Sequence, residues 1–234
     1  RELLSHVSHE LKTPLVAMEE TNRLLLDEIP GPLTPKQKRF LRLNVESSAR
    51  LSSMIMKLLD ISRLEVGVSL QTKRQPIEEI VEEAVTEFEG QAHESGITLV
   101  FDTQDNRVHV QCERERLIQV FENLIENAIK FAPDGTSIGV KIHSNTNLPD
   151  SLLIKSGIHL SDIPEGGGYA IIEVSDEGPG IPDELKEKIF EKFFQVRSPE
   201  QDRKKGIGLG LAICREIIAC HHGAIWVEDR TEGG

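Results

Sequence analysis

The sequence is poor in aromatic residues and cysteines, and it has no long hydrophobic run. Aromatic residues make up 4% of the chain, so its core must be built mainly from leucine, isoleucine and valine. The three cysteines, Cys112, Cys214 and Cys220, lack the spacing of a metal site, which favours a reducing compartment. No apolar run approaches the ~18 residues that a membrane helix requires, and no stretch has the pattern of a signal peptide.

The chain also lacks a surplus of basic residues. It contains 27 lysines and arginines against 39 aspartates and glutamates, which gives a net charge of −12. This argues against the class of proteins that bind a nucleic-acid backbone, because they need a concentrated basic surface. It does not exclude ATP, since backbone amides, one or two cations and a metal ion can hold a triphosphate.

The first part of the chain carries two helical patterns joined by a turn. Apolar residues recur every three or four positions over residues 4–29 and again over 36–64. Residues 29–35 contain three prolines and a glycine, which predicts a turn. Pro14 lies inside the first pattern and should kink the helix. A lone antiparallel hairpin cannot bury its stripes on both flanks, so we expect a dimeric four-helix bundle.

Beyond this hairpin the pattern changes to alternating helices and strands. We expect a hairpin domain at 1–66, a linker at 67–74 and a second domain at 75–234. The predicted helices cover 77–89, 114–131 and a segment after Gly208; the predicted strands lie at 97–101, 108–110, 138–143, 169–175 and 224–228. This mixture indicates a two-layer α/β sandwich and an α+β chain overall. Residues 144–168 are expected to form a long surface insertion.

The first candidate site is Ser8-His9-Glu10-Leu11-Lys12-Thr13-Pro14. On the helical wheel His9 lies roughly 160° from the centre of the apolar stripe, so its imidazole should face solvent. Thr13, one turn later, shares this face, and Glu10 flanks it. An exposed imidazole beside a carboxylate can act as a nucleophile, because the carboxylate can orient the ring or accept its proton. Taken alone, the pattern is more often an ordinary surface histidine.

The predicted helix at 114–131 carries a polar stripe. Asn123 and Asn127 are one helical turn apart, and their amide oxygens are reasonable partners for Mg²⁺ together with waters and phosphates. The opposite face, which includes Leu117 and Phe121, is expected to join the core. Without further context, a solvated polar face is the commoner explanation.

Two glycine-rich segments follow predicted secondary structure. In Asp176-Glu177-Gly178-Pro179-Gly180, a carboxylate at a strand end can accept a hydrogen bond from an exocyclic amine, and the glycines let a planar ring approach the backbone. An ordinary Gly-Pro turn explains this segment equally well.

The second such segment, Gly206-Ile207-Gly208-Leu209-Gly210, opens a predicted helix whose free amides and dipole favour a phosphate. It is not a P-loop, and no strand runs directly into it as a Rossmann fingerprint requires. The segment before it is charged and includes Phe190-Glu191-Lys192-Phe193-Phe194. This combination of charges and aromatic side chains is typical of a lid that folds over a ligand.

In this order, these segments resemble the H, N, G1, F and G2 boxes of two-component sensor histidine kinases. The resemblance covers nearly the whole chain. It implies a dimerisation and phosphoacceptor hairpin followed by an ATP-binding domain of the Bergerat type. It also implies autophosphorylation from ATP with Mg²⁺, phosphotransfer to an aspartate of a response regulator, and phosphatase activity toward that regulator. The chain would then be the cytoplasmic portion of a larger sensor, with a membrane anchor upstream.

Position by position, the resemblance makes His9 the phosphoacceptor and Glu10 its base partner. It makes Thr13 the residue that positions a water when the regulator is dephosphorylated. The residues that it implies for the ATP site are Asn123 and Asn127 at the Mg²⁺, Lys130 near the phosphates, Asp176 as adenine reader with Gly178 and Gly180 beside it, Gly206, Gly208 and Gly210 at the triphosphate, and Lys204 among the lid cations.

The chain departs from the family pattern at several points. Ile207 stands where many relatives have threonine, and Gln195 stands where an arginine is common. The insertion at 144–168 is longer than usual, and the usual last strand is missing. A Bergerat-fold ATPase or clamp, which uses ATP only for conformational change, is the alternative; such a clamp does not need the histidine hairpin.

Overall fold

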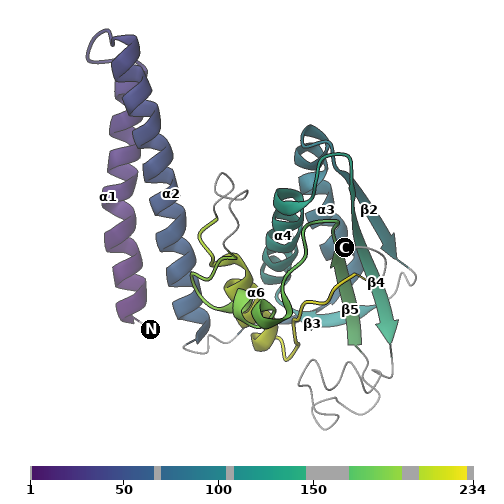
Figure 1. Cartoon of the computed structure of the whole chain (residues 1–234). Coiled ribbons are helices and arrows are strands. Elements are labelled where there is room, and N and C mark those ends of the chain that lie inside the picture. The colour runs from purple at the N-terminus through teal and green to yellow at the C-terminus, as the bar shows by residue number, and fades with distance from the viewer. Residues whose placement is uncertain (1, 66–69, 104–107, 146–168, 197–205, 231–234) are drawn as a thin grey trace. The chain divides into compact units, whose positions relative to one another are not determined.

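The computed structural model describes residues 2–65, 70–103, 108–145, 169–196 and 206–230, with the backbone alone for residues 2–12 and 144–145. The chain divides into two compact units, Arg1–Val68 and Ser69–Gly234 (Figure 1).

The first unit is a hairpin of two long helices, α1 (Glu2–Leu26) and α2 (Pro35–Glu65), which pack against each other. The assigned helix α1 runs through Pro14 without a break. The turn is held by Glu28, whose Oε1 accepts a hydrogen bond from the Leu33 amide at 2.7 Å and lies 3.1 Å from the Lys38 Nζ. Thr34 and Gln37 cap the start of α2. The Gln37 Oε1 accepts hydrogen bonds from the Thr34 amide and hydroxyl, and the Thr34 Oγ1 accepts one from the Gln37 amide.

The second unit contains a three-stranded sheet in the order β2-β4-β5, formed by β2 (Thr98–Thr103), β4 (Ser137–Asn145) and β5 (Tyr169–Ser175). β2 is parallel to β4, and β4 is antiparallel to β5. A separate antiparallel pair joins β1 (Lys73–Pro76) to β3 (His109–Cys112).

Three α-helices complete this unit, α3 (Ile77–Glu94), α4 (Arg114–Phe131) and α6 (Gly210–Cys220), together with two short 3-10 helices, η2 (Asp183–Leu185) and η3 (Lys188–Phe190). α3 packs on β2 and α4, whereas α4 also contacts β5 and α6. In Figure 1, α3 and α4 lie side by side over one face of the sheet. The predicted α+β class with a two-layer sandwich is confirmed.

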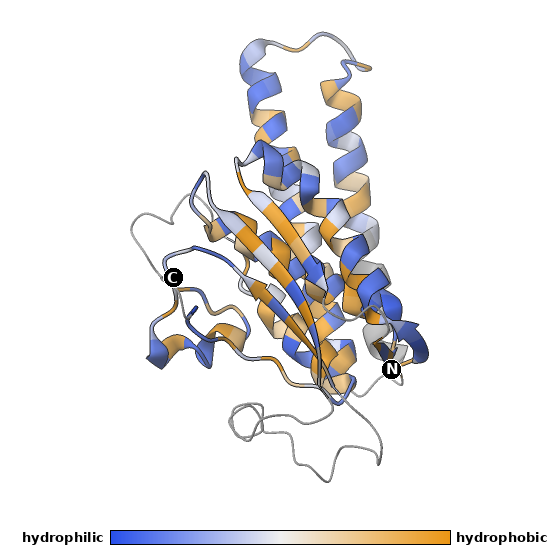
Figure 2. Ribbon diagram, turned by 90° about the vertical axis from the view of Figure 1, so that its right-hand side faces the viewer, coloured by the Kyte–Doolittle hydropathy of each residue, from blue (hydrophilic) through white to orange (hydrophobic). Residues whose placement is uncertain are grey.

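The core between these layers is aliphatic, as the composition predicts. Along β4, Ile138, Val140 and Ile142 are buried while Lys141 between them is exposed, which is the alternation of a strand with one face in the core (Figure 2). The fully buried large side chains of the described residues are all isoleucine, leucine or valine.

Three predicted elements differ from the structure. The linker predicted at 67–74 overlaps β1, since Lys73 and Arg74 already pair with β3. Residues 144 and 145, expected in the insertion, belong to β4, and 146–168 lie outside the described residues. The strand predicted at 224–228 is wrong, because this segment forms no strand ladder.

The physical reason for this last difference is that no neighbouring strand pairs with the segment, since the sheets of the described residues contain only β1-β3 and β2-β4-β5. The Trp226 indole N–H donates to the Glu228 Oε1 at 2.8 Å, and Asp229 pairs with the Lys186 ammonium at 2.6 Å.

Candidate nucleotide site

Helix α4 presents the asparagines on a half-buried face. Its other face packs into the core through Leu117, Val120, Phe121, Ile125, Ala128 and Ile129. Asn123, Asn127 and Lys130 are spaced by four and three residues and are half-buried. The Asn123 Nδ2 donates to the Gln119 carbonyl at 2.7 Å, which fixes the amide and leaves its Oδ1 directed toward α6.

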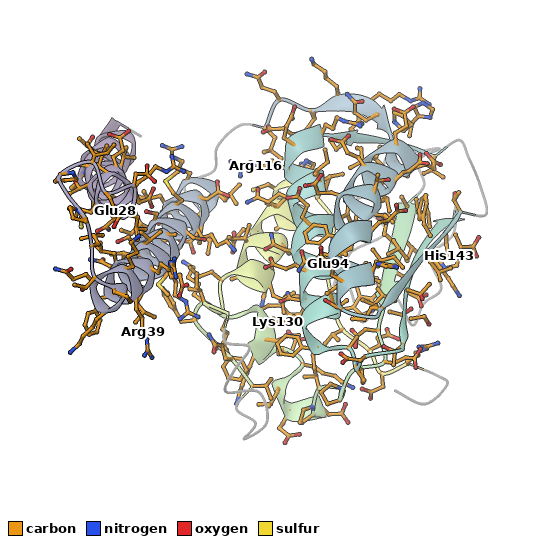
Figure 3. All side chains as sticks on the ribbon, turned by 90° about the horizontal axis from the view of Figure 1, so that it is seen from above. Glu28, Arg39, Glu94, Arg116, Lys130 and His143 are labelled. Atoms are coloured by element: carbon orange, nitrogen blue, oxygen red, sulfur yellow. The ribbon has the colours of Figure 1, made fainter. Side chains whose placement is uncertain are left out.

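The glycine-rich segment before α6 lies directly against this face. A Cβ on Gly210 would lie 3.0 Å from the Asn123 Oδ1, and one on Gly206 would lie 2.9 Å from the Lys130 Nζ. Lys130 is labelled in Figure 3 and also lies 5.0 Å above the Phe131 ring. Two motifs far apart in sequence therefore meet at one place, where a cation, an amide oxygen and a helix N-terminus come together.

Gly208 is the most constrained of these glycines. Its φ is +74°, and a Cβ there would lie 2.6 Å from the Phe194 carbonyl oxygen and 2.8 Å from the Phe193 carbonyl carbon. The Phe193 amide in turn donates to the Gly208 carbonyl at 2.7 Å. Only glycine combines this backbone conformation with so close an approach of two chain segments.

The Asp176 turn is built against the C-terminal end of α4. The Asp176 Oδ1 accepts a hydrogen bond from the Gly178 amide at 2.7 Å. A Cβ on Gly178 would lie 2.6 Å from that same oxygen and 3.3 Å from the Phe131 carbonyl oxygen, and Gly180 has a φ of +70°. The turn is therefore compact, and its backbone lies close to α4.

Glu177, which sequence reasoning passed over, anchors this turn to the sheet. Its Oε1 accepts hydrogen bonds from the Ser137 hydroxyl at 3.0 Å and the Ser137 amide at 3.3 Å, and the Arg230 Nη1 lies 3.6 Å away. These hydrogen bonds from Ser137, followed by the Arg230 charge, lower the pKa of Glu177. Its place beside Asp176 was the available signal, but its partner Ser137 is 40 residues away in sequence.

Gln195 is a second residue with a role that sequence reasoning missed. Its Nε2 donates to the Gly206 carbonyl at 2.8 Å. Together with the bond between Phe193 and Gly208, it ties the phenylalanine-rich segment to the glycine-rich one. Lys204, predicted as a lid cation, lies outside the described residues.

The remaining predicted residues belong to the helix hairpin. His9 and Glu10 belong to α1, in the part of the helix for which the structure describes the backbone alone. Thr13 is described and exposed. Among the described residues, no three histidine, cysteine, aspartate or glutamate side chains gather as a metal site. No helix of the described part is long and apolar enough to cross a membrane.

Comparison with known proteins gives matches over both units. Residues 112–234 match the family model of histidine kinase-, DNA gyrase B- and HSP90-like ATPases, and residues 1–67 match the His Kinase A phospho-acceptor domain. The chain is 31% identical over 236 residues to the sensor histidine kinase TmoS of Ectopseudomonas mendocina, which covers 100% of this chain and 22% of that protein. It is 32% identical over 234 residues to the sensor-like histidine kinase SenX3 of Mycolicibacterium smegmatis, which covers 99% and 55%. The chain thus spans between about a fifth and about half of these relatives.

Solved structures are similar as well. Full-length ShkA in complex with AMPPNP has a TM-score of 0.74 and 26% identity, and the match covers 98% of this chain and 43% of that one. The nucleotide-free catalytic domain of histidine kinase ThkA has a TM-score of 0.51 and 30% identity, and the match covers 69% of this chain and 89% of that one.

Proposed function

The chain belongs to the sensor histidine kinases of two-component systems, and on that premise we propose that it transfers the γ-phosphoryl group of ATP to His9. The phosphoryl group would then pass to an aspartate of a response regulator. One observation carries the ATP-binding part of this proposal: the glycine-rich segment and the Asp176 turn both lie against α4, the helix that carries Asn123 and Asn127.

The two ends of α4 suit the two ends of ATP. At its C-terminal end, the Asp176 carboxylate would accept a hydrogen bond from the adenine amine, while Gly178 and Gly180 leave room for the ring. Along the helix, the Lys130 ammonium, the segment containing Gly206 and Gly208, and the N-terminal amides of α6 from Gly210 would hold the phosphates. Lys204 would add a further cation.

The amide oxygens of Asn123 and Asn127 fit a Mg²⁺ ion, because it prefers hard oxygen ligands and keeps part of its water shell. The fixed Asn123 amide, with its Oδ1 facing Gly210, is the observation that supports this fit. When bound, Mg²⁺ would neutralise charge on the phosphate oxygens. The two asparagines would hold it, Asn127 foremost.

In the transfer step, an imidazole nitrogen of His9 would attack the γ-phosphorus, and the bond from that phosphorus to the bridging oxygen of ADP would break. Glu10 would orient the ring and accept its N–H proton, so that a phosphoramidate forms and ADP leaves. Rate enhancement would come mostly from positioning and charge neutralisation. The residues between α2 and β1 would let the ATP-binding unit reach the helix.

We propose Thr13 as the residue that positions a water when the regulator's phospho-aspartate is hydrolysed. We further propose that the hairpin forms a homodimer and that this part of the protein acts in the cytoplasm, where ATP and a regulator are available. The match of residues 1–67 to a phospho-acceptor domain favours a kinase over an ATP-driven clamp.

Incubation with γ-labelled ATP tests the proposal. We expect label that is labile in acid and stable in alkali, and we expect it to disappear in His9→Gln. Asp176→Asn should abolish labelling by weakening ATP binding while His9 stays intact. A clamp would instead hydrolyse ATP without becoming labelled. Label that persists in His9→Gln would overturn the assignment of His9.

A further inference from the structure

The helix hairpin contains buried polar side chains where a two-helix unit would be expected to bury apolar ones. Asn22 on α1 is only 6% exposed and Ser48 on α2 only 7%, and they are the buried polar residues of the described chain. Beside Asn22 lies a cavity of about 260 Å³ lined by Ala17, Met18, Thr21, Asn22 and Asn44. Two carboxamides and a hydroxyl thus line this cavity, and a hydrogen bond from the Ser52 Oγ to the Glu19 Oε1 at 2.9 Å also joins the two helices.

The hydroxyls near this cavity are already engaged within their own helices. The Thr21 Oγ1 donates to the Ala17 carbonyl at 2.7 Å, and the Ser48 Oγ donates to the Asn44 Oδ1 at 3.4 Å. The carboxamide N–H groups of Asn22 and Asn44 supply further donors beside the cavity. The cavity is large enough for several waters or for another side chain, since a water occupies roughly 30 Å³.

Two residues that line the cavity, Met18 and Asn44, are exposed, and Asn44 lies one helical turn after Phe40 on the side of α2 that carries an uncovered apolar stripe. On α2, Phe40, Leu43, Leu51 and Leu58 are each between 42% and 59% exposed. With Ser47 and Met54 they give the series 40, 43, 47, 51, 54, 58, whose steps of three, four, four, three and four residues keep these side chains on one side of the helix, with one more step of four than a strict heptad has. Ser47 is the one polar residue of this series. It lies three residues after Asn44 and directly before Ser48. Met18, at the mouth of the cavity on α1, is 47% exposed.

A second copy of the hairpin is the occupant that this stripe fits. An apolar seam along a helix is covered by another helix that carries a matching seam. A pair of chains related by a two-fold axis uses the same patch on both partners. In a dimer whose two-fold axis is parallel to the helices, each residue lies at the same height along the axis as the same residue of the partner. The polar level at Asn22 and Asn44 would then meet its own copy, and the cavity would be closed only by the partner.

We infer that Asn22 and Asn44 form a polar layer inside the dimer, with the cavity completed by the second copy, and that this layer selects the partner and its register. This rests on the dimer proposed above and goes beyond it. A buried amide layer lowers the stability of the pair but strongly disfavours any pairing in which an amide faces an apolar side chain. A hairpin of another chain with leucine at this level would therefore be rejected.

The test uses the whole 234-residue chain and its variant Asn22→Leu. We expect the Asn22→Leu homodimer to dissociate about tenfold less readily than the natural one, because apolar packing replaces a buried polar layer. In a mixture of natural and variant chains at equal concentration, native mass spectrometry should find mixed dimers well below the statistical share of about half.

Glu20→Leu is the matched control. Glu20 is exposed and lies about 200° around α1 from Asn22, so this variant adds the same side chain away from the cavity. It should mix with the natural chain in the statistical proportion. If Asn22→Leu is poorly folded, Asn22→Ala provides the same comparison, and it too should be under-represented in mixed dimers.

Asn22→Leu chains that dimerise with unchanged affinity and mix statistically would overturn the polar layer. A natural chain that stays monomeric at all concentrations would overturn the dimer itself. The two failures are distinguishable, because the second is seen before any variant is made.

Discussion

Replacement of Gly208 by alanine should damage nucleotide binding far more than replacement of its neighbour Gly206. Gly208 has a φ of +74°, and a Cβ there would meet two backbone atoms of Phe193 and Phe194 at 2.8 and 2.6 Å. Backbone atoms cannot move aside as a flexible side chain can. The glycine-rich segment of Gly208→Ala must therefore leave its place against the phenylalanine-rich segment.

The magnitude follows from two contributions. An alanine in the left-handed region costs about 1–2 kcal/mol, and forced overlap in a packed place adds roughly 1–3 kcal/mol. Even the lower bound of about 2 kcal/mol corresponds to a roughly 30-fold loss in an equilibrium constant. We expect this loss in the affinity for an ATP analogue, measured by titration calorimetry. The reason is that Gly208→Ala displaces the glycine-rich segment, which lies beside Lys130.

Gly206→Ala is the control in the same segment. The backbone of Gly206 is not in the left-handed region, and its added Cβ would meet only the Lys130 Nζ, the end of a flexible side chain. Gly206→Ala should therefore lower the affinity for the ATP analogue only a few-fold. Thermal unfolding of both variants should show that the sandwich is intact. Equal affinity of the two variants would refute the reasoning, since it would mean that the close approach at Gly208 is not needed for binding.

Three further predictions concern stability. His222 has a φ of +58° directly after α6, where its amide and that of the next residue cap the helix, so His222→Gly should raise the free energy of unfolding by about 1 kcal/mol in urea denaturation. Burial and then three neighbouring glutamates raise the pKa of Glu122 above 4.5, so its charged form opposes folding; Glu122→Gln should raise the melting temperature at pH 7 and have no such effect well below pH 4.5. Ser137 lowers the pKa of Glu177 below 4.5, so that carboxylate contributes stability above this pH that is lost as pH falls through its folded pKa; Ser137→Ala should reduce this acid loss in melting curves taken between pH 7 and pH 3.

The helices were predictable where periodicity and local chemistry coincide. The bounds of α4 were predicted as 114–131 and are confirmed, because its apolar face repeats regularly and Pro133 follows its end. The strand predicted at 224–228 failed although isoleucine, tryptophan and valine favour strands. A strand exists only if a neighbour supplies the ladder, and composition carries no information about that neighbour.

The site shows the same division between local and tertiary information. Asn123, Asp176 and the glycines could be proposed as site residues because each belongs to a short motif. Glu177 was missed because its partners, Ser137 and Arg230, become neighbours only when β4, β5 and the last described segment come together. No residue type marks such a contact in advance, since a glutamate in a turn is ordinary on its own.

The contacts around α4 also indicate which side of the site is built more firmly. The Asp176 turn directly continues β5, and Glu177 fastens it to Ser137 at the start of β4, so its position is set by the sheet. The glycine-rich segment lies close to α4 at Gly206 and Gly210, and Leu209 within it is buried in the core. Its tie to the phenylalanine-rich segment consists of the hydrogen bonds made by Phe193 and Gln195. The Gln195 bond is exposed, whereas those to Glu177 are part-buried, and exposed bonds open at lower cost. We therefore expect the proposed adenine side to be largely formed before ATP arrives, and the proposed phosphate side to gain more of its order from the phosphates themselves.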